Sequence, residues 1–181
     1  MTDFLSQEER DLLLKLARDT IEGLLKKRGR PLPEDVPKRL YEKRGAFVTL
    51  KVDGQLRGCI GYPLPYKPLV ETVIEMALAA ATKDHRFPPI KAKELGRLKI
   101  EISALTIPQP IQDIKEIEVG RHGIIISKGI DRGLLLPQVP TEYGWNLDTY
   151  LRHGCLKAGL DEDEWRKGAK LEVFEAQVFS E

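Results

Sequence analysis

The sequence predicts an α+β fold, in which helices pack on a mainly antiparallel sheet. Residues 46–52 and 55–62 are two strand-like segments around Asp53 and Gly54, a dipeptide typical of a two-residue hairpin turn. Three further segments carry the apolar spacing of helices. Hairpins mixed with helices, rather than strict alternation of strand and helix, favour antiparallel pairing.

The first predicted helix covers about Gln7 to Arg28. Ser6 and Glu9 have the spacing of a capping box, and apolar residues then recur every three or four positions opposite charged ones. Gly29 and the prolines that follow should end the helix, so we expect an extended connector next.

Two later helices are predicted. Pro68 can open a helix that runs to about Thr82, and because its side chains are apolar nearly all round, it should be buried between other elements. The last helix begins near Asn146, with Cys155 on its apolar stripe and Gly159 placed as a C-terminal cap.

The remaining strands are predicted from alternation and turn signals. Residues 98–104 alternate apolar and polar side chains, which is the pattern of a strand with one face in water. Further strands are predicted at Gly123–Ser127, Gly133–Leu136 and Leu171–Phe179, the first two joined through a turn at Lys128 and Gly129.

The composition is that of a soluble globular protein. Of the 181 residues, 41% are hydrophobic and 31% are charged, which fits one folding unit or two closely packed lobes. The 29 basic and 28 acidic side chains leave a net charge of +1, so no global charge draws the chain to nucleic acid or to a membrane. The sequence shows neither a secretory signal nor an apolar run of roughly 18 residues, and we expect a cytoplasmic protein. Both cysteines should be reduced there, although the thermophile-like composition leaves an intracellular disulfide open.

The first candidate site is the stretch Leu56–Gly61, which reads LRGCIG. Residues two apart on a strand share a face and lie roughly 6.5–7 Å apart, so Arg57 and Cys59 are expected to be neighbours. A guanidinium this close favours the thiolate, the form that acts as a nucleophile or metal ligand. Gly58 and Gly61 lack a Cβ and would let a ligand approach the backbone.

The alternative is that Cys59 is a small buried side chain, that the glycines permit close packing and that Arg57 pairs with a carboxylate. With a two-residue turn, Cys59 would lie opposite Val48 and share a face with Leu50, which favours burial. An arginine on the same face argues against burial. The sequence leaves both hypotheses open.

The second candidate site is the segment after the middle helix, Lys83–Pro89. Lys83 and Arg86 could join Arg57 in a cationic pocket for phosphate or carboxylate, with Asp84 orienting one of them. The alternative is a helix stop, because cations near a helix C-terminus suit its dipole and a residue before proline favours extended backbone.

The remaining titratable residues give weaker signals. His122, at the start of a predicted strand, is the candidate base for Cys59, although no spacing argument brings the two together. Cys155 is interpreted as structural because it lies on a core-facing stripe. Neither cysteine has a second Cys or a His at ligand spacing, so no metal site is predicted, and no phosphate loop, dinucleotide fingerprint or nameable cofactor follows from the sequence.

With these residues in view, the sequence resembles the AMMECR protein family, also called protein A of the AmmeMemoRadiSam system. The matching blocks, in family order, are Leu56–Gly61, Ala81 with Lys83-Asp84 and Arg86–Pro89, Gly120 with His122–Ile124, and Leu136–Val139 with Gly144-Trp145. The first block matches the signature hexapeptide of the family. The chain is therefore expected to be one AMMECR domain over residues 1–181.

The resemblance implies an α+β fold of a larger and a smaller lobe, with the signature near a cleft between them. It implies a basic cellular role, in transcription, replication, repair or translation, and association with a Memo-like protein and a radical SAM enzyme, but no established reaction.

Three functional hypotheses follow. In the first, which we rank highest, the signature region binds a small anionic ligand or a partner. In the second, Cys59 is the reactive thiol of an enzyme or redox partner. In the third, the protein is associated with nucleic acid or is a protein-protein adaptor, although balanced charge and 7% aromatic residues count against an extended nucleic-acid surface.

Overall fold

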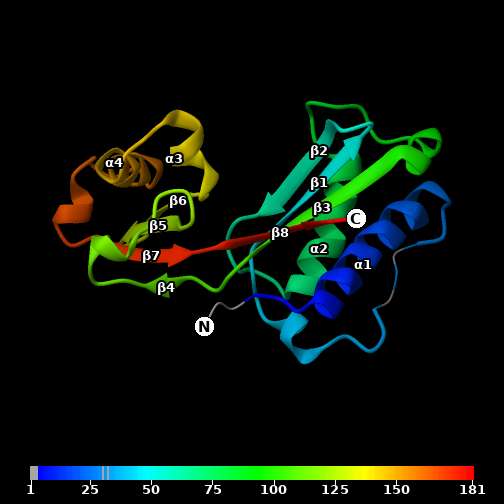
Figure 1. The fold of residues 1–181 in the computed structure, drawn as a ribbon, viewed down its shortest axis with the longest axis horizontal. Helices are drawn as coiled ribbons and strands as arrows, with labels where there is room; N and C mark the ends of the chain where they lie inside the picture. Colours follow the sequence, from blue (N-terminus) through cyan, green and yellow to red (C-terminus); the bar gives the residue numbers. More distant parts are fainter. Residues whose placement is uncertain (1–3, 30, 32) are drawn as a thin grey trace. The chain divides into compact units, whose positions relative to one another are not determined.

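The computed structural model describes residues 4–29, 31 and 33–181. The chain divides into two compact units, Met1–Leu105 with Gln177–Glu181, and Thr106–Ala176, which we call unit 1 and unit 2 (Figure 1). The α+β class and the antiparallel pairing are confirmed, since the hairpins β1–β2 and β5–β6 and the pairs β1–β3 and β5–β7 are all antiparallel.

Unit 1 combines two long helices with a four-stranded sheet in the order β2-β1-β3-β8. Its elements, with η for a 3-10 helix, are α1 (Gln7–Leu25), η1 (Lys38–Tyr41), β1 (Ala46–Val52), β2 (Gln55–Tyr62), α2 (Leu69–Thr82), η2 (Ala92–Arg97), β3 (Leu98–Leu105) and β8 (Ala176–Ser180).

Helix α1 begins with the predicted capping box. The Ser6 hydroxyl accepts the Glu9 N–H at 3.2 Å, and the Glu9 carboxylate accepts the Ser6 N–H at 2.8 Å. The helix ends at Leu25 rather than at the predicted Arg28, because Lys27 adopts a positive φ of 55°. Residues 30 and 32 of the expected connector lie outside the described residues, and residues 38–41 form η1 instead of extended chain.

The β1–β2 hairpin has the predicted turn but not the predicted register. Asp53 and Gly54 have φ angles of 51° and 78°, as the two-residue turn requires. The register then shifts at a β-bulge, which leaves Arg57 as an extra residue in β2. The prediction that Cys59 lies opposite Val48 is therefore wrong, because Cys59 pairs with Thr49.

The core of unit 1 lies between the sheet and its two helices. As predicted, α2 is buried nearly all round, because it packs against α1 and against β1 and β2. Val48 and Ile100 are fully buried in this core. Successive strand residues alternate faces, so Thr49 and Glu101 lie on the sheet face that points away from α1 and α2.

Unit 2 has a second four-stranded sheet in the order β4-β7-β5-β6. Its elements are β4 (Gln109–Pro110), η3 (Ile114–Glu116), β5 (Gly123–Lys128), β6 (Asp131–Leu135), α3 (Gln138–Tyr143), α4 (Leu147–Lys157), η4 (Glu164–Arg166) and β7 (Lys170–Phe174).

Helix α4 closes the core of unit 2 by packing over β5 and β6. Tyr150 and Cys155 are fully buried there, and Gly154 lets the helix approach the sheet, since a Cβ at this position would lie 2.7 Å from an Ile126 side-chain carbon. The predicted cap is confirmed, because Gly159 follows the helix with a φ of 77°.

One predicted strand is two strands in two sheets. The segment Leu171–Phe179 is interrupted at Glu175, so that β7 pairs with β5 in unit 2 while β8 lies beside β3 in unit 1. Over the residues that the structure describes, no helix is long and apolar enough to cross a membrane.

Candidate functional site

The signature hexapeptide lies on β2, the edge strand of the unit 1 sheet. The bulge at Arg57 interrupts the strict alternation that placed Arg57 and Cys59 on one face in the sequence-based prediction. The two side chains consequently have different neighbours, and each is described from its own contacts.

The Cys59 thiol is half-buried and hydrogen-bonded. Thr49, directly opposite on β1, donates its hydroxyl to the Cys59 Sγ at 3.2 Å. This contact lies on the sheet face opposite the buried Val48, so Cys59 is not part of the helix-covered core.

The Arg57 side chain forms its hydrogen bonds with the chain segment that follows α2. Its Nε donates to the Glu94 carboxylate at 2.8 Å, and its Nη1 and Nη2 donate to the carbonyl oxygens of Pro88 and Pro89 at 2.7 and 3.3 Å. The hydrogen bond from Arg57 lowers the pKa of the Glu94 carboxyl, although burial opposes this shift. Because the Arg57 side chain is only 16% exposed and already paired, it serves mainly to pin this segment to β2.

Asp84 is the acceptor at which the two candidate sites meet. Its carboxylate, 4% exposed, accepts the Cys59 backbone N–H at 2.9 Å and the Arg86 Nε and Nη2 donors at 2.9 and 2.7 Å. The Arg86 side-chain hydrogen bonds hold the pKa of the Asp84 carboxyl far below its usual range, although burial opposes this shift. The expected role of Asp84 in orienting an arginine therefore has a specific partner, Arg86.

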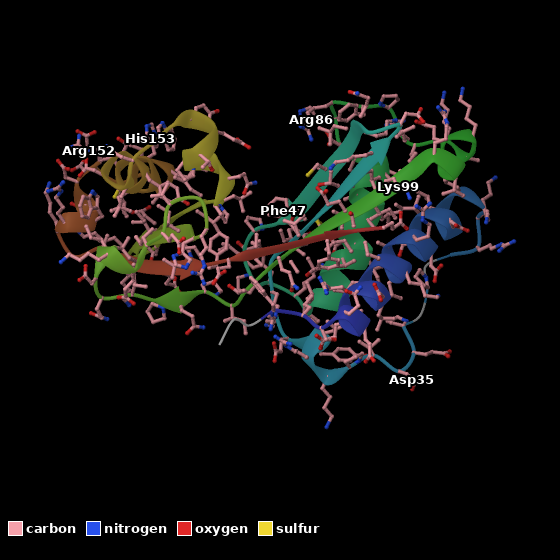
Figure 2. All side chains as sticks on the ribbon, viewed as in Figure 1. Asp35, Phe47, Arg86, Lys99, Arg152 and His153 are labelled. Atoms are coloured by element: carbon pink, nitrogen blue, oxygen red, sulfur yellow. The ribbon has the colours of Figure 1, made fainter. Side chains whose placement is uncertain are left out.

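Arg86 is the cation that the Asp84 carboxylate holds in place. Its pKa is raised, chiefly by the hydrogen bond to Asp84, and the nearby Cys59 contributes in the same direction. The side chain is 50% exposed, so one side of the guanidinium is held by the protein while the other meets solvent. Figure 2 shows Arg86 beside the β2 edge of the sheet.

The two signature glycines lie against the protein itself. A Cβ at Gly58 would lie 2.2 Å from the Ala80 carbonyl oxygen of α2, and a Cβ at Gly61 would lie 2.4 Å from ring carbons of Phe47. Gly58 thus allows α2 to approach β2, and Gly61 makes room for the opposing Phe47 ring. Their predicted contact with a ligand stays a prediction.

Lys83 is placed differently from Arg86. It follows the last residue of α2, where its backbone N–H donates to the Ala79 carbonyl at 2.7 Å, and its side chain is exposed. The helix-stop interpretation therefore accounts for Lys83. It does not account for the contacts of Asp84 and Arg86, which belong to the candidate site.

His122 belongs to unit 2 and Cys59 to unit 1, and the proposed pairing of the two stays a prediction. The His122 Nδ1 accepts the Glu118 N–H at 3.0 Å, so a neutral ring carries its proton on Nε2. The nitrogen that could act as a base is thus already occupied within its own turn.

Cys155 is confirmed as a packing residue of unit 2. Its side chain is fully buried, and burial raises the pKa of its thiol. Both thiols are free in the structure. Within residues 4–29, 31 and 33–181, no group of three His, Cys, Asp or Glu side chains is placed to hold a metal ion.

Two members of the site were missed at the sequence level. Thr49 has no local signal, since its contact depends on the bulge, and Glu94 is 37 residues from Arg57. The Glu94 carboxylate also accepts the Lys91 N–H at 2.8 Å at the start of η2, but lysine is not a capping residue, so the sequence carries no signal for this contact or for Arg57.

Comparison with known proteins shows which family this chain resembles. The family model described as AMMECR1 matches residues 14–179, which span both units. Protein MK0488 of Methanopyrus kandleri is 50% identical over 192 residues, covering 100% of this chain and 92% of the relative. Protein MJ0810 of Methanocaldococcus jannaschii is 46% identical over 186 residues, covering 98% of this chain and 92% of the relative.

A solved structure extends the likeness to the fold. The crystal structure of the uncharacterized protein PH0010 from Pyrococcus horikoshii superposes with a TM-score of 0.76 at 43% sequence identity. The match covers 98% of this chain and 93% of the solved chain. The chain described here belongs to the AMMECR1 family.

Proposed function

We propose that the signature region of unit 1 binds a small anion at Arg86, directly beside the Cys59 thiol. The observation that supports this is the position of Arg86, half exposed and oriented by a buried carboxylate that also holds the Cys59 N–H. A guanidinium held on one side and open on the other can offer its remaining N–H donors to phosphate or carboxylate oxygens.

Of the three cations that the sequence suggested, the contacts favour Arg86. Arg57 gives its donors to Glu94 and to two backbone carbonyls, so binding an anion there would leave these acceptors unsatisfied. Lys83 is exposed at the end of α2 and can add attraction without defining a geometry. The cleft that the family resemblance implies beside this region stays a prediction.

The test compares an anionic with a neutral thiol reagent at Cys59. In a Cys155→Ser background, the rates of alkylation by iodoacetate and by iodoacetamide are measured and their ratio is divided by the ratio for glutathione. An anion-accepting cation beside the thiol raises this normalised ratio. Arg86→Gln should lower the ratio about fivefold, which corresponds to roughly 1 kcal/mol of lost attraction near a solvated surface.

Arg97→Gln is the matched control, because Arg97 is similarly exposed and paired to an aspartate, Asp53, away from the thiol. It should leave the ratio unchanged. A normalised ratio near one that does not respond to Arg86→Gln would reject the proposal, whatever the absolute reactivity of Cys59.

A second candidate function is favoured by the Thr49 hydroxyl that donates to Sγ. In this proposal Cys59 is the reactive thiol of an enzyme or redox partner, since its sulfur is only half-buried and already accepts a hydrogen bond from a neighbouring side chain. The same alkylation series separates the two candidates: high reactivity toward both reagents supports a reactive thiol, whereas selectivity for the anionic reagent supports an anion site.

Association with a Memo-like protein and a radical SAM enzyme is retained as a proposal from the family resemblance. Pull-down of these proteins that survives both Cys59→Ser and Arg86→Gln would favour an adaptor role in which the signature builds the fold. A role on nucleic acid requires binding that weakens steeply with salt, and the balanced charge of +1 argues against it.

A further inference from the structure

The outer edge of β2 carries backbone groups that the sheet does not use. β2 lies at the edge of the unit 1 sheet, with β1 as its neighbour. In an antiparallel pair, every second residue directs its N–H and C=O away from the partner strand. Cys59 is one of these residues, because its N–H donates to Asp84 and not to β1. Gly61 lies two positions further along β2 with no register shift between them, so it also faces outward.

The first half of this outer edge is covered, whereas the second half is open. The segment that follows α2 covers the first half, where Asp84 accepts the Cys59 N–H and Arg57 donates to the Pro88 carbonyl at 2.7 Å. The N–H and C=O of Gly61, in contrast, have no hydrogen-bond partner among the residues that the structure describes. Gly61 is also partly exposed. An unpaired strand edge of this kind is a template for an added strand.

An aromatic ring lies over the open half of the edge. Phe47 pairs with Gly61 from β1, and both belong to the sheet face that points away from α1 and α2. A Cβ at Gly61 would lie 2.4 Å from two Phe47 ring carbons, so the ring covers the position that a side chain would take on β2. A residue of an added strand that pairs with Gly61 would direct its side chain to this same face, beside the ring.

A cation stands where the open half of the edge ends. The Arg86 guanidinium is 50% exposed, and it is held by the same Asp84 carboxylate that accepts the Cys59 N–H. Figure 2 shows Arg86 toward the start of β2 and Phe47 toward its end. The edge therefore offers a positive charge, a free pair of backbone groups and an aromatic surface in that order along one strand.

This order selects the direction of the added strand and the group at its end. In an antiparallel strand, the residue that pairs with Gly61 is followed by a residue opposite Ile60. Beyond that point Asp84 takes the Cys59 N–H, so the added strand must stop there. A peptide that ends opposite Ile60 brings a terminal carboxylate toward Arg86, and this charge complements the guanidinium.

We propose that the anion held at Arg86 is the C-terminal carboxylate of an extended peptide that adds to β2 in the antiparallel direction, an inference that rests on the anion site proposed above. The N–H of the penultimate residue donates to the Gly61 carbonyl, and its carbonyl accepts the Gly61 N–H. Its side chain packs on the Phe47 ring. The last residue lies opposite Ile60, and its carboxylate accepts hydrogen bonds from Arg86.

The test uses the peptide acetyl-Ala-Phe-Ala with a free carboxylate, titrated into the full chain and followed by amide chemical shifts and hydrogen exchange. The peptide should shift the Gly61 amide and slow its exchange. The C-terminally amidated peptide lacks the charge and should bind about tenfold more weakly. The peptide that is N-methylated at its Phe lacks the N–H for the Gly61 carbonyl and should bind about fivefold more weakly.

Variants then assign the two ends of the site. Arg86→Gln should remove the preference for the free carboxylate over the amide. The control Arg97→Gln changes a similarly exposed arginine that is also paired to an aspartate, and it should leave this preference unchanged. Phe47→Leu should weaken both peptides severalfold and keep the preference.

Acetate separates this inference from the anion site on which it rests. If acetate shifts the Cys59 amide in the wild type but not in Arg86→Gln, while the peptide leaves Gly61 exchange unchanged, the peptide inference is overturned and the anion site stands. If Arg86→Gln alters the response to neither acetate nor the peptide, both are overturned. The peptide inference also fails if the amidated or N-methylated peptide binds the wild type as well as the parent peptide, a comparison that depends on no variant.

Discussion

The Asp84 carboxylate accepts the backbone N–H of Cys59 at 2.9 Å, across 25 residues of sequence. The same carboxylate holds the Arg86 guanidinium through two hydrogen bonds. One buried acid thus sets the position of both the strand that carries the thiol and the cation beside it. The predictions below follow from this arrangement and from the packing around it.

Replacing Asp84 by Asn should destabilise the protein in a pH-dependent way. The loss of a charged, buried acceptor should lower the free energy of unfolding at neutral pH by about 1.5–3 kcal/mol. Because the pKa of Asp84 is depressed in the folded state, its contribution is present above the unfolded value of about 3.9 and is lost as the pH falls through the lower folded value. The gap between wild type and variant should therefore narrow below about pH 4.

Urea unfolding at neutral pH and at steps below about pH 5 measures this gap. Asp53→Asn is the control, because the Asp53 carboxylate is 56% exposed and its loss should cost little. A gap that stays constant with pH would mean that Asp84 acts through its shape and not through its charge.

Replacing Gly58 by Ala should destabilise unit 1. The added Cβ would lie 2.2 Å from the Ala80 carbonyl oxygen, and neither β2 nor α2 can move apart without disturbing the core. Overpacking of this kind costs about 1–3 kcal/mol of unfolding free energy. Gly96→Ala is the matched control, since its added Cβ meets nothing within 4 Å. Equal stability of the two variants in thermal unfolding would contradict the packing role of Gly58.

Replacing Thr49 by Val should slow the reaction of Cys59 with neutral iodoacetamide. The hydroxyl that donates to Sγ at 3.2 Å is removed while the shape of the side chain is kept, so the thiolate loses a stabilising donor. A fall of severalfold is expected at constant pH in the Cys155→Ser background. Ser103→Ala, on the same sheet face but opposite Phe47, should leave the rate unchanged. An unchanged rate in Thr49→Val would show that this hydroxyl does not act on the thiol.

Cys155 should react only when unit 2 unfolds. The thiol is fully buried and its pKa is raised by that burial, so the nucleophilic thiolate is both rare and inaccessible. In a Cys59→Ser background, its alkylation rate should follow the urea unfolding transition. Rapid labelling of the native protein would mean that unit 2 opens locally around α4.

The sequence by itself determined the elements whose signals are local. Asp53 and Gly54 adopt the positive φ angles of the predicted turn, and the hairpin strands have the predicted bounds. Three helix features were also predictable: the capping box at Ser6, the burial of α2 and the cap at Gly159. They depend on apolar periodicity and on helix start and stop signals, which involve residues only one or a few helical turns apart. The family signature, likewise, is contiguous.

Only the tertiary structure decided which residues meet at the site. A single bulge at Arg57 moved Cys59 from Val48 to Thr49, and a one-residue slip changes the face of every later side chain in the strand. Arg86 is the arginine that shares the Asp84 carboxylate with the Cys59 N–H, whereas Glu94 and two proline carbonyls take up Arg57. No local sequence pattern indicated that the last predicted strand would be divided between two sheets at Glu175. In each case the outcome depends on residues that are distant in sequence. These residues compete for the same hydrogen-bond donors and the same strand edges, and a local sequence pattern does not show which of them succeeds.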